Sequence, residues 1–140
     1  MNLWLLDASV LLAGEDADDD HHWDALRLMG GEDPLATLDL AFYEVTNVAV
    51  RVWGDPQAAW RLRERVAAIG EDGGLVRADA PLLSEAASIV GEHAISAYDA
   101  AYVAAARHVG AQLVSCDVRD LVSRSLACLP ADVPNPSESR

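Results

Sequence analysis

The chain has 140 residues, 51% of them hydrophobic, which suits one compact domain with a single core. Its 23 acidic and 10 basic residues give a formal net charge of −13, and every basic residue is an arginine. Because the chain has no lysine, it is neither a receiver domain nor a haloacid-dehalogenase phosphatase, since both balance phosphoryl charge with a lysine. An acidic surface should repel nucleic acid at long range and attract a basic protein partner.

No segment approaches the roughly 18 to 20 consecutive apolar residues of a membrane helix, and the N-terminus lacks the features of a signal peptide. The two cysteines, Cys116 and Cys128, are too few for a disulfide framework and lack the spacing of metal ligands. We therefore expect a cytoplasmic protein with reduced thiols and no membrane contact.

The first part of the chain alternates apolar runs of strand length with helical spacing. Asp7 follows the first apolar run and can cap a short helix. The acidic stretch at 15–20 favours a solvated loop. The expected elements are a strand at 3–6, a helix at 10–14, a helix at 21–29 with Trp23 on its apolar face, a strand at 35–38, and a helix at 40–53 ending at Gly54.

The rest of the chain continues this alternation. Pro56 suits the first position of a helix, and Gly110 suits the end of another. The expected elements are a helix at 57–69 with Trp60 on its apolar face, a strand at 75–77, helices at 81–93 and 96–109, and a strand at 112–116. The pattern predicts an α/β fold, a three-layer α/β/α sandwich around a mostly parallel sheet of four to five strands.

Two carboxylates stand at the ends of the first and last predicted strands. Asp7 and Asp117 would project from the carboxyl edge of a parallel sheet, where ligands bind in open α/β folds. Each also has a purely structural explanation, since Asp7 can cap a helix and Asp117 can open a turn.

Two further acids lie on predicted helices. The stretch 96–99 is a capping-box pattern, so the Asp99 carboxylate can instead satisfy backbone amides. Glu44 falls at the margin of an apolar arc that reaches Val52. A carboxylate in that position needs a partner, because its desolvation costs several kcal/mol, and either a cation or Arg51 can serve.

Four acids that one topology can bring together indicate a metal site. Carboxylates a few ångströms apart repel unless protons or a metal neutralise them. Hard oxygen ligands suit Mg²⁺ or Mn²⁺, and the lack of thiolates or paired histidines in the set argues against zinc. Such a site supports metal-assisted hydrolysis of phosphodiester bonds.

Taken together and in this order, the acid motifs resemble those of the PIN-domain ribonucleases, and within them the VapC-type toxins of bacterial toxin-antitoxin pairs. The likeness runs from about residue 3 to 129. It implies a PIN domain over residues 1–130, followed by a flexible tail over 131–140. The matching motifs are DAS after the first strand, AFYEVTNVAVRV, SAYDAAYVAAA and LVSCDVRDL.

The resemblance implies a Mg²⁺- or Mn²⁺-dependent endoribonuclease that acts as a toxin. It also implies an RNA substrate, a homodimer, and a cognate antitoxin whose basic C-terminal segment lies over a groove near the first four helices. The implied catalytic and metal-binding acids are Asp7, Glu44, Asp99 and Asp117. The implied supporting residues are Ser9, which would orient the first acid or a bound water, Ser115, Asn47, and Asp120, which would replace or support Asp117.

Alternatives remain open at this point. A non-toxic RNA-processing nuclease and a non-catalytic PIN-like protein-binding module would share the fold. Neighbouring His21 and His22 point to different sides of a helix, so we predict that they lie at the surface and do not bind zinc. Phosphate contact and surface solvation both explain Arg51, Arg61, Arg63, Arg65, Arg107 and Arg119.

Overall fold

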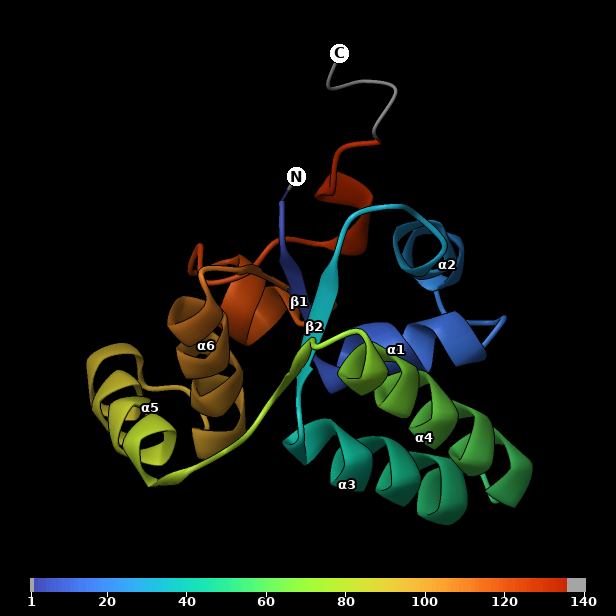
Figure 1. Ribbon diagram of the computed structural model, residues 1–140, viewed down its shortest axis with the longest axis horizontal. Helices are drawn as coiled ribbons and strands as arrows, with labels where there is room; N and C mark the ends of the chain where they lie inside the picture. Colours follow the sequence, from blue (N-terminus) through green and yellow to red (C-terminus); the bar gives the residue numbers. More distant parts are fainter. Residues whose placement is uncertain (1, 136–140) are drawn as a thin grey trace.

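The computed structural model describes residues 2–135 and shows a β-sheet between two layers of helices (Figure 1). The strands run parallel in the order β3-β2-β1-β4, which confirms the predicted α/β sandwich. In the register, Leu6 of β1 pairs with Thr37 on one side and Val114 on the other, so the carboxyl ends of the three strands lie level. The strands are β1 (Trp4–Leu6), β2 (Leu35–Leu38), β3 (Leu75–Val76) and β4 (Gln112–Val114).

The two faces of the sheet carry different helices, as Figure 1 shows. Helices α1 (Ala8–Glu15), α2 (His22–Met29), α3 (Leu40–Asn47) and α4 (Pro56–Glu71) lie on one side, and α5 (Ala80–His93) and α6 (Ala97–Val109) lie on the other. Among residues 2–135, no helix is long and apolar enough to cross a membrane. The shorter helical segments are η1 (Val48–Val52) and η2 (Val118–Val122), both π-helical, and η3 (Pro130–Asp132), a 3-10 helix.

Alternating side chains of the central strand β1 pack into two separate hydrophobic cores. Trp4 and Leu6 pack among buried residues of α1 to α4, whereas Leu5 packs among those of α5 and α6. This alternation follows from the two-residue period of a strand. The buried run of small side chains at 100–106 covers the second face, where Tyr102 is the one large ring. Both faces of the sheet are therefore covered, as a parallel sheet requires.

Strand β4 is shorter than the predicted strand at 112–116. Beyond Val114, the Ser115 backbone N–H donates to the Cys128 carbonyl oxygen over 2.9 Å. The next two amides donate to side-chain hydroxyls instead of a strand, Cys116 to Ser9 over 2.9 Å and Asp117 to Ser115 over 3.0 Å. The strand therefore ends where backbone N–H groups begin to bond to side-chain hydroxyls and no longer to a neighbouring strand.

The helix predicted at 40–53 changes its winding part of the way along. It is α-helical to Asn47 and π-helical over Val48–Val52, where the Trp53 N–H donates to the Val48 carbonyl over 3.0 Å. The wider turn rotates the later side chains relative to a regular helix. Val52, predicted on the apolar arc, is exposed for this reason.

Two tryptophans lie on the solvent side, contrary to the prediction. Trp60 is exposed on α4, while the buried positions of that helix include Leu62 and Val66. Two residues along a helix correspond to about 200°, so Trp60 falls away from the face that buries Leu62. Trp23 is likewise exposed on α2, where Ala25 and Leu28 are buried instead.

The packed part of the chain continues past residue 130. Val133 is buried in the core beside α1 to α4. The Arg27 guanidinium of α2 donates to the carbonyl oxygens of Pro130 and Val133 over 3.0 and 3.1 Å. The segment at 130–133 is therefore held against α2, and the remainder of the predicted flexible tail, 136–140, lies outside the described residues.

Candidate metal centre

Asp7 lies directly after β1, where it both caps a helix and belongs to the group of candidate metal-binding acids. It is the N-cap of α1, where its Oδ1 accepts from the Val10 N–H over 3.3 Å and from the Ser9 hydroxyl. Its side chain is only 5% exposed. Burial raises the pKa of Asp7 to about 6, although bonds from Ser115, Ser9 and Val10 oppose the rise, and the Asp99 charge adds to it. Capping the helix thus leaves the carboxylate facing the other acids.

Two predicted supporting serines join the ends of β1 and β4. The Ser9 hydroxyl donates to Asp7 and accepts from the Cys116 N–H, and the Ser115 hydroxyl accepts from the Asp117 N–H. The two hydroxyl oxygens lie 3.4 Å apart. The serines therefore set the position of Asp7 relative to Asp117.

Three carboxylates from two elements form a compact group. Oxygen atoms of Asp99, Asp117 and Asp120 all lie within 4.8 Å of one another. Asp99 comes from the first turn of α6, while Asp117 caps η2 and accepts from the Asp120 N–H over 3.0 Å. The π-helical turn of η2 thus brings Asp120 to the side of Asp117.

Asp99 is not needed for the cap of its own helix, which Ser96 provides. The Ser96 hydroxyl accepts from the Asp99 backbone N–H over 3.1 Å. The pKa of Asp99 is raised, first by burial and then by the charges of Asp117 and Asp120, although the Ser96 side chain opposes the rise. The carboxylate is therefore surrounded by charge of its own sign.

Glu44 has a partner that sequence patterns did not indicate. The Tyr102 hydroxyl of α6 donates to Glu44 Oε1 over 2.7 Å. Among the ion pairs of the described residues none joins Glu44 to Arg51. Burial raises the pKa of Glu44, the Tyr102 bond lowers it, and the Asp99 charge raises it. Tyr102 follows Asp99 by three residues on a helix, and this spacing placed it on the same face.

Asp99 is the electrostatic centre of the five acids. Its charge raises the pKa of both Asp7 and Glu44, and its own pKa responds to Asp117 and Asp120. The fold therefore brings the four predicted acids together and adds Asp120. Arg119 lies 3.9 Å from Asp120 but is itself exposed to solvent. The group of Asp99, Asp117 and Asp120 contains neither thiolate nor imidazole, and its anionic oxygens fit a hard divalent cation.

The other residues singled out from the sequence lie around this centre or apart from it. Asn47 is exposed and lines a cavity beside Glu44. His22 is buried, contrary to the surface prediction, with its Nδ1 2.8 Å from the Ala13 carbonyl oxygen. The backbone partner of this ring nitrogen offsets part of the cost of burying the imidazole.

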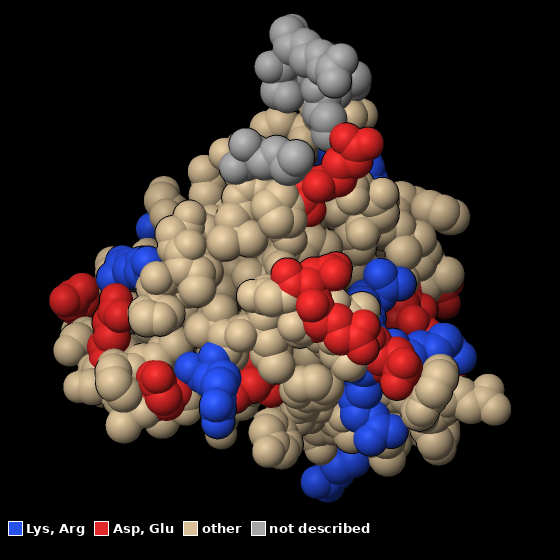
Figure 2. All heavy atoms as spheres, viewed as in Figure 1, with Lys and Arg blue, Asp and Glu red and all other residues tan. Residues whose placement is uncertain are grey.

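Several basic side chains lie on one side of the molecule, interleaved with acidic ones, and others lie elsewhere on its surface (Figure 2). Arg61 pairs with Glu15, and Arg119 lies 3.9 Å from Asp120, an exposed pair worth little to stability. Figure 2 shows basic groups over the lower right of the view, where Figure 1 has α3 and α4. The arginines contributed by η1 and α4 are Arg51, Arg61, Arg63 and Arg65.

Replacement of Tyr102 by phenylalanine is expected to lower the free energy of unfolding by about 1–2 kcal/mol, because Glu44 loses a hydrogen bond to its charged form. Urea denaturation at neutral pH measures the change. Tyr98→Phe is the control, since Tyr98 is exposed on the same helix. Equal stability of the wild-type protein and both variants would contradict the role given to this bond.

A family model described as the PIN domain matches residues 4–123. A search of curated proteins found no match. Solved structures with the same fold include a toxin-antitoxin complex from Klebsiella pneumoniae, at 16% identity over 90% of this chain and 96% of that one, with a TM-score of 0.68. VapC20 from Mycobacterium tuberculosis, described as a sarcin-ricin loop cleaving toxin, is 25% identical over 80% and 86% of the two chains, with a TM-score of 0.65. A Pyrobaculum aerophilum protein is 26% identical over 93% and 90%, with a TM-score of 0.66.

Proposed function

The chain belongs to the PIN domain family, and from this premise we propose that it is a metal-dependent endoribonuclease acting as the toxin of a toxin-antitoxin pair. The observation that carries the proposal is the convergence of four carboxylates, those of Asp7, Glu44, Asp117 and Asp120, on Asp99 at the carboxyl edge of the parallel sheet. Similarity to VapC20 and to a toxin-antitoxin complex supports the toxin assignment.

We assign Mg²⁺ or Mn²⁺ to the acid cluster. Asp99, Asp117 and Asp120 would hold the ion, with Asp7 and Glu44 beside them as further ligands or charge partners. When bound, the metal would supply Lewis acidity and lower the pKa of a water molecule at the scissile phosphodiester. Ser9 and Ser115 would keep Asp7 oriented, and Tyr102 would do the same for Glu44.

The proposed partners follow from charge and family. RNA would be the substrate, and the metal would offset the repulsion between its phosphates and a chain of net charge −13. A cognate antitoxin with a basic C-terminal segment would be attracted to the same acidic surface. A homodimer is the assembly that we infer from the resemblance to VapC-type toxins.

Removal of metal is expected to abolish RNA cleavage. The purified protein should cut total bacterial RNA in the presence of Mg²⁺ or Mn²⁺, lose this activity in EDTA, and regain it when excess Mn²⁺ is added. Gel analysis of the RNA, followed by mapping of the new 5′ ends, measures the reaction and locates the cut.

Expression of the protein in a bacterial host separates the remaining alternatives. A toxin should arrest growth, and co-expression of a short upstream open reading frame should relieve the arrest. RNA cleavage without growth arrest would instead identify an RNA-processing nuclease. If the protein neither cleaves RNA nor becomes more stable when Mn²⁺ is added, it is the non-catalytic protein-binding module.

A further inference from the structure

Each of the two helical acids of the centre is directly preceded by an exposed tyrosine. Tyr43 precedes Glu44 on α3, and Tyr98 precedes Asp99 on α6. The two tyrosines are 76% and 63% exposed. Neighbouring helical residues are about 100° apart, so a tyrosine that precedes a ligand stands at the rim of the site.

Both tyrosines line one surface cavity of about 820 Å³. The volume lies within the roughly 300–1,000 Å³ of pockets that accept small ligands. Glu44 lines the same cavity, so the hollow is continuous with the acid cluster through a residue that they share. Asn47 and Thr46 add amide and hydroxyl groups to its wall.

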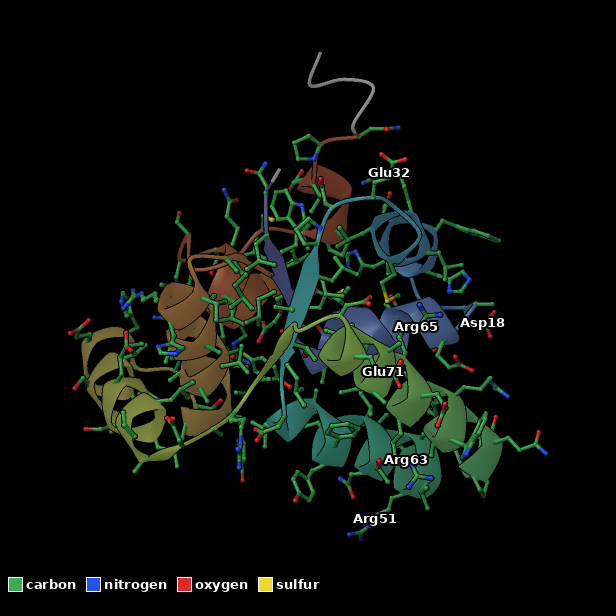
Figure 3. The ribbon with its side chains drawn as sticks, viewed as in Figure 1. Asp18, Glu32, Arg51, Arg63, Arg65 and Glu71 are labelled. Atoms are coloured by element: carbon green, nitrogen blue, oxygen red, sulfur yellow. The ribbon has the colours of Figure 1, made fainter. Side chains whose placement is uncertain are left out.

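The cavity also contains a cation. Arg63 of α4 is exposed and lines it together with Tyr98 of α6, and Figure 3 shows this arginine on the side of the molecule where α3 and α4 lie. The wall of the cavity also includes Asp39, Leu40 and Phe42. A guanidinium in the same wall as two tyrosine rings fits a nucleotide, which presents both an anionic phosphate and an aromatic base. Phosphate pairs with guanidinium, and every base has a face that stacks on an aromatic ring.

We propose that Tyr43 and Tyr98 stack on bases of single-stranded RNA next to the scissile phosphodiester, with Arg63 on a neighbouring phosphate. The inference rests on the proposed ribonuclease function and assigns it a binding subsite. Stacking requires bases that are free of a duplex, so the cut would fall in a loop or another unpaired segment. Because any base can stack, these rings would add affinity with little sequence preference.

The test uses Tyr43→Ala and Tyr98→Ala in the full-length protein. Each variant is expected to raise KM for a single-stranded RNA substrate about 5- to 100-fold with kcat little changed, because a stacking contact binds ground state and transition state alike. Tyr43→Phe and Tyr98→Phe keep the ring and should retain the wild-type KM. Trp23→Ala is the matched control, since Trp23 is also 76% exposed but lies on α2 away from the cavity.

Binding is measured separately from cleavage, with fluorescein-labelled, random-sequence single-stranded RNA in EDTA and fluorescence anisotropy as the readout. If the wild-type protein cleaves RNA and the alanine variants keep its KM and affinity, the stacking inference fails while the proposed function stands. If the wild-type protein binds RNA but does not cleave it, and the alanine variants lose affinity, the proposed function fails while the stacking inference stands. If the phenylalanine variants lose as much affinity for RNA as the alanine variants, the tyrosines act through their hydroxyl groups, and the stacking inference fails.

Sedimentation of the same variants tests whether a second copy of the chain, instead of RNA, occupies the cavity. If the wild-type protein is a dimer and Tyr43→Ala or Tyr98→Ala is a monomer, the tyrosines are contacts between subunits and the inference is overturned. Unchanged sedimentation, together with the expected rise in KM, supports RNA as the occupant of the cavity.

Discussion

Replacement of Asp99 by asparagine is expected to slow RNA cleavage by about 100- to 1,000-fold while the protein remains folded. Asp99 is the one acid that interacts electrostatically with all four others, so its removal takes away the centre of the charge that would hold the metal. A bound metal contributes several kcal/mol of transition-state stabilisation, and each 1.36 kcal/mol corresponds to a factor of ten in rate. The initial rate on the mapped RNA substrate measures the loss.

Asp20→Asn is the control for the Asp99 variant, because Asp20 is an exposed acid in the loop between α1 and α2. It removes the same charge from the chain without altering the cluster, and its cleavage rate should equal that of the wild-type protein. Wild-type activity in Asp99→Asn would exclude the acid cluster as the site of catalysis. A low rate in both variants would mean that overall charge is the cause.

Replacement of Asp7 by asparagine is expected to stabilise the metal-free protein at about pH 7.5 by about 3 kcal/mol. Asp7 has a pKa of about 6 in the folded protein, against 3.8 for an unperturbed carboxyl group, mainly because it is buried. The folded state therefore binds more protons than the unfolded state between these values, and the wild-type protein loses stability as the pH rises through them. Asparagine cannot ionise and escapes this loss.

Urea denaturation in EDTA at about pH 4 and about pH 7.5 checks the Asp7 prediction, and the gain should shrink toward pH 4. Mn²⁺ should reverse the order at the higher pH, because a ligand that binds only the folded state stabilises it and the variant lacks one carboxylate. Asp55→Asn is the matched control: Asp55 also caps a helix, with its Oδ1 3.0 Å from the Ala58 nitrogen, but lies outside the cluster. A pH-independent effect of Asp7→Asn would contradict the argument.

The elements that carry strong local signals were predictable from the sequence. Continuous apolar runs predicted the strands, and Gly110 ends α6 with the positive φ of 68° that favours glycine. Asp7 and Asp117 were placed correctly at the carboxyl edge because parallel strands share one. The strand order β3-β2-β1-β4 could not be predicted, since strand neighbours depend on contacts that no local pattern encodes.

The parts that escaped prediction depend on geometry between distant residues. The bond from Tyr102 to Glu44 spans 58 positions, and the spacing of Tyr102 from Asp99 shows only which helix face it shares and not which residue it meets. The π-helical winding of η1 changes which side chains face inward, so regular helical spacing misplaced Val52. The error at Trp60 was avoidable, because regular helical spacing places a residue two positions before the buried Leu62 toward solvent.

The position of β1 between β2 and β4 also sets when the site can form during synthesis. Its neighbour β4 and the π-helical segment η2 are made late. A growing chain that ends before residue 112 already contains Asp7, Glu44 and Asp99 but lacks Asp117 and Asp120. One edge of β1 is then unpaired, and the acid cluster is incomplete. Under the proposed function, the nascent chain on the ribosome would therefore stay inactive until nearly all of the domain has been translated.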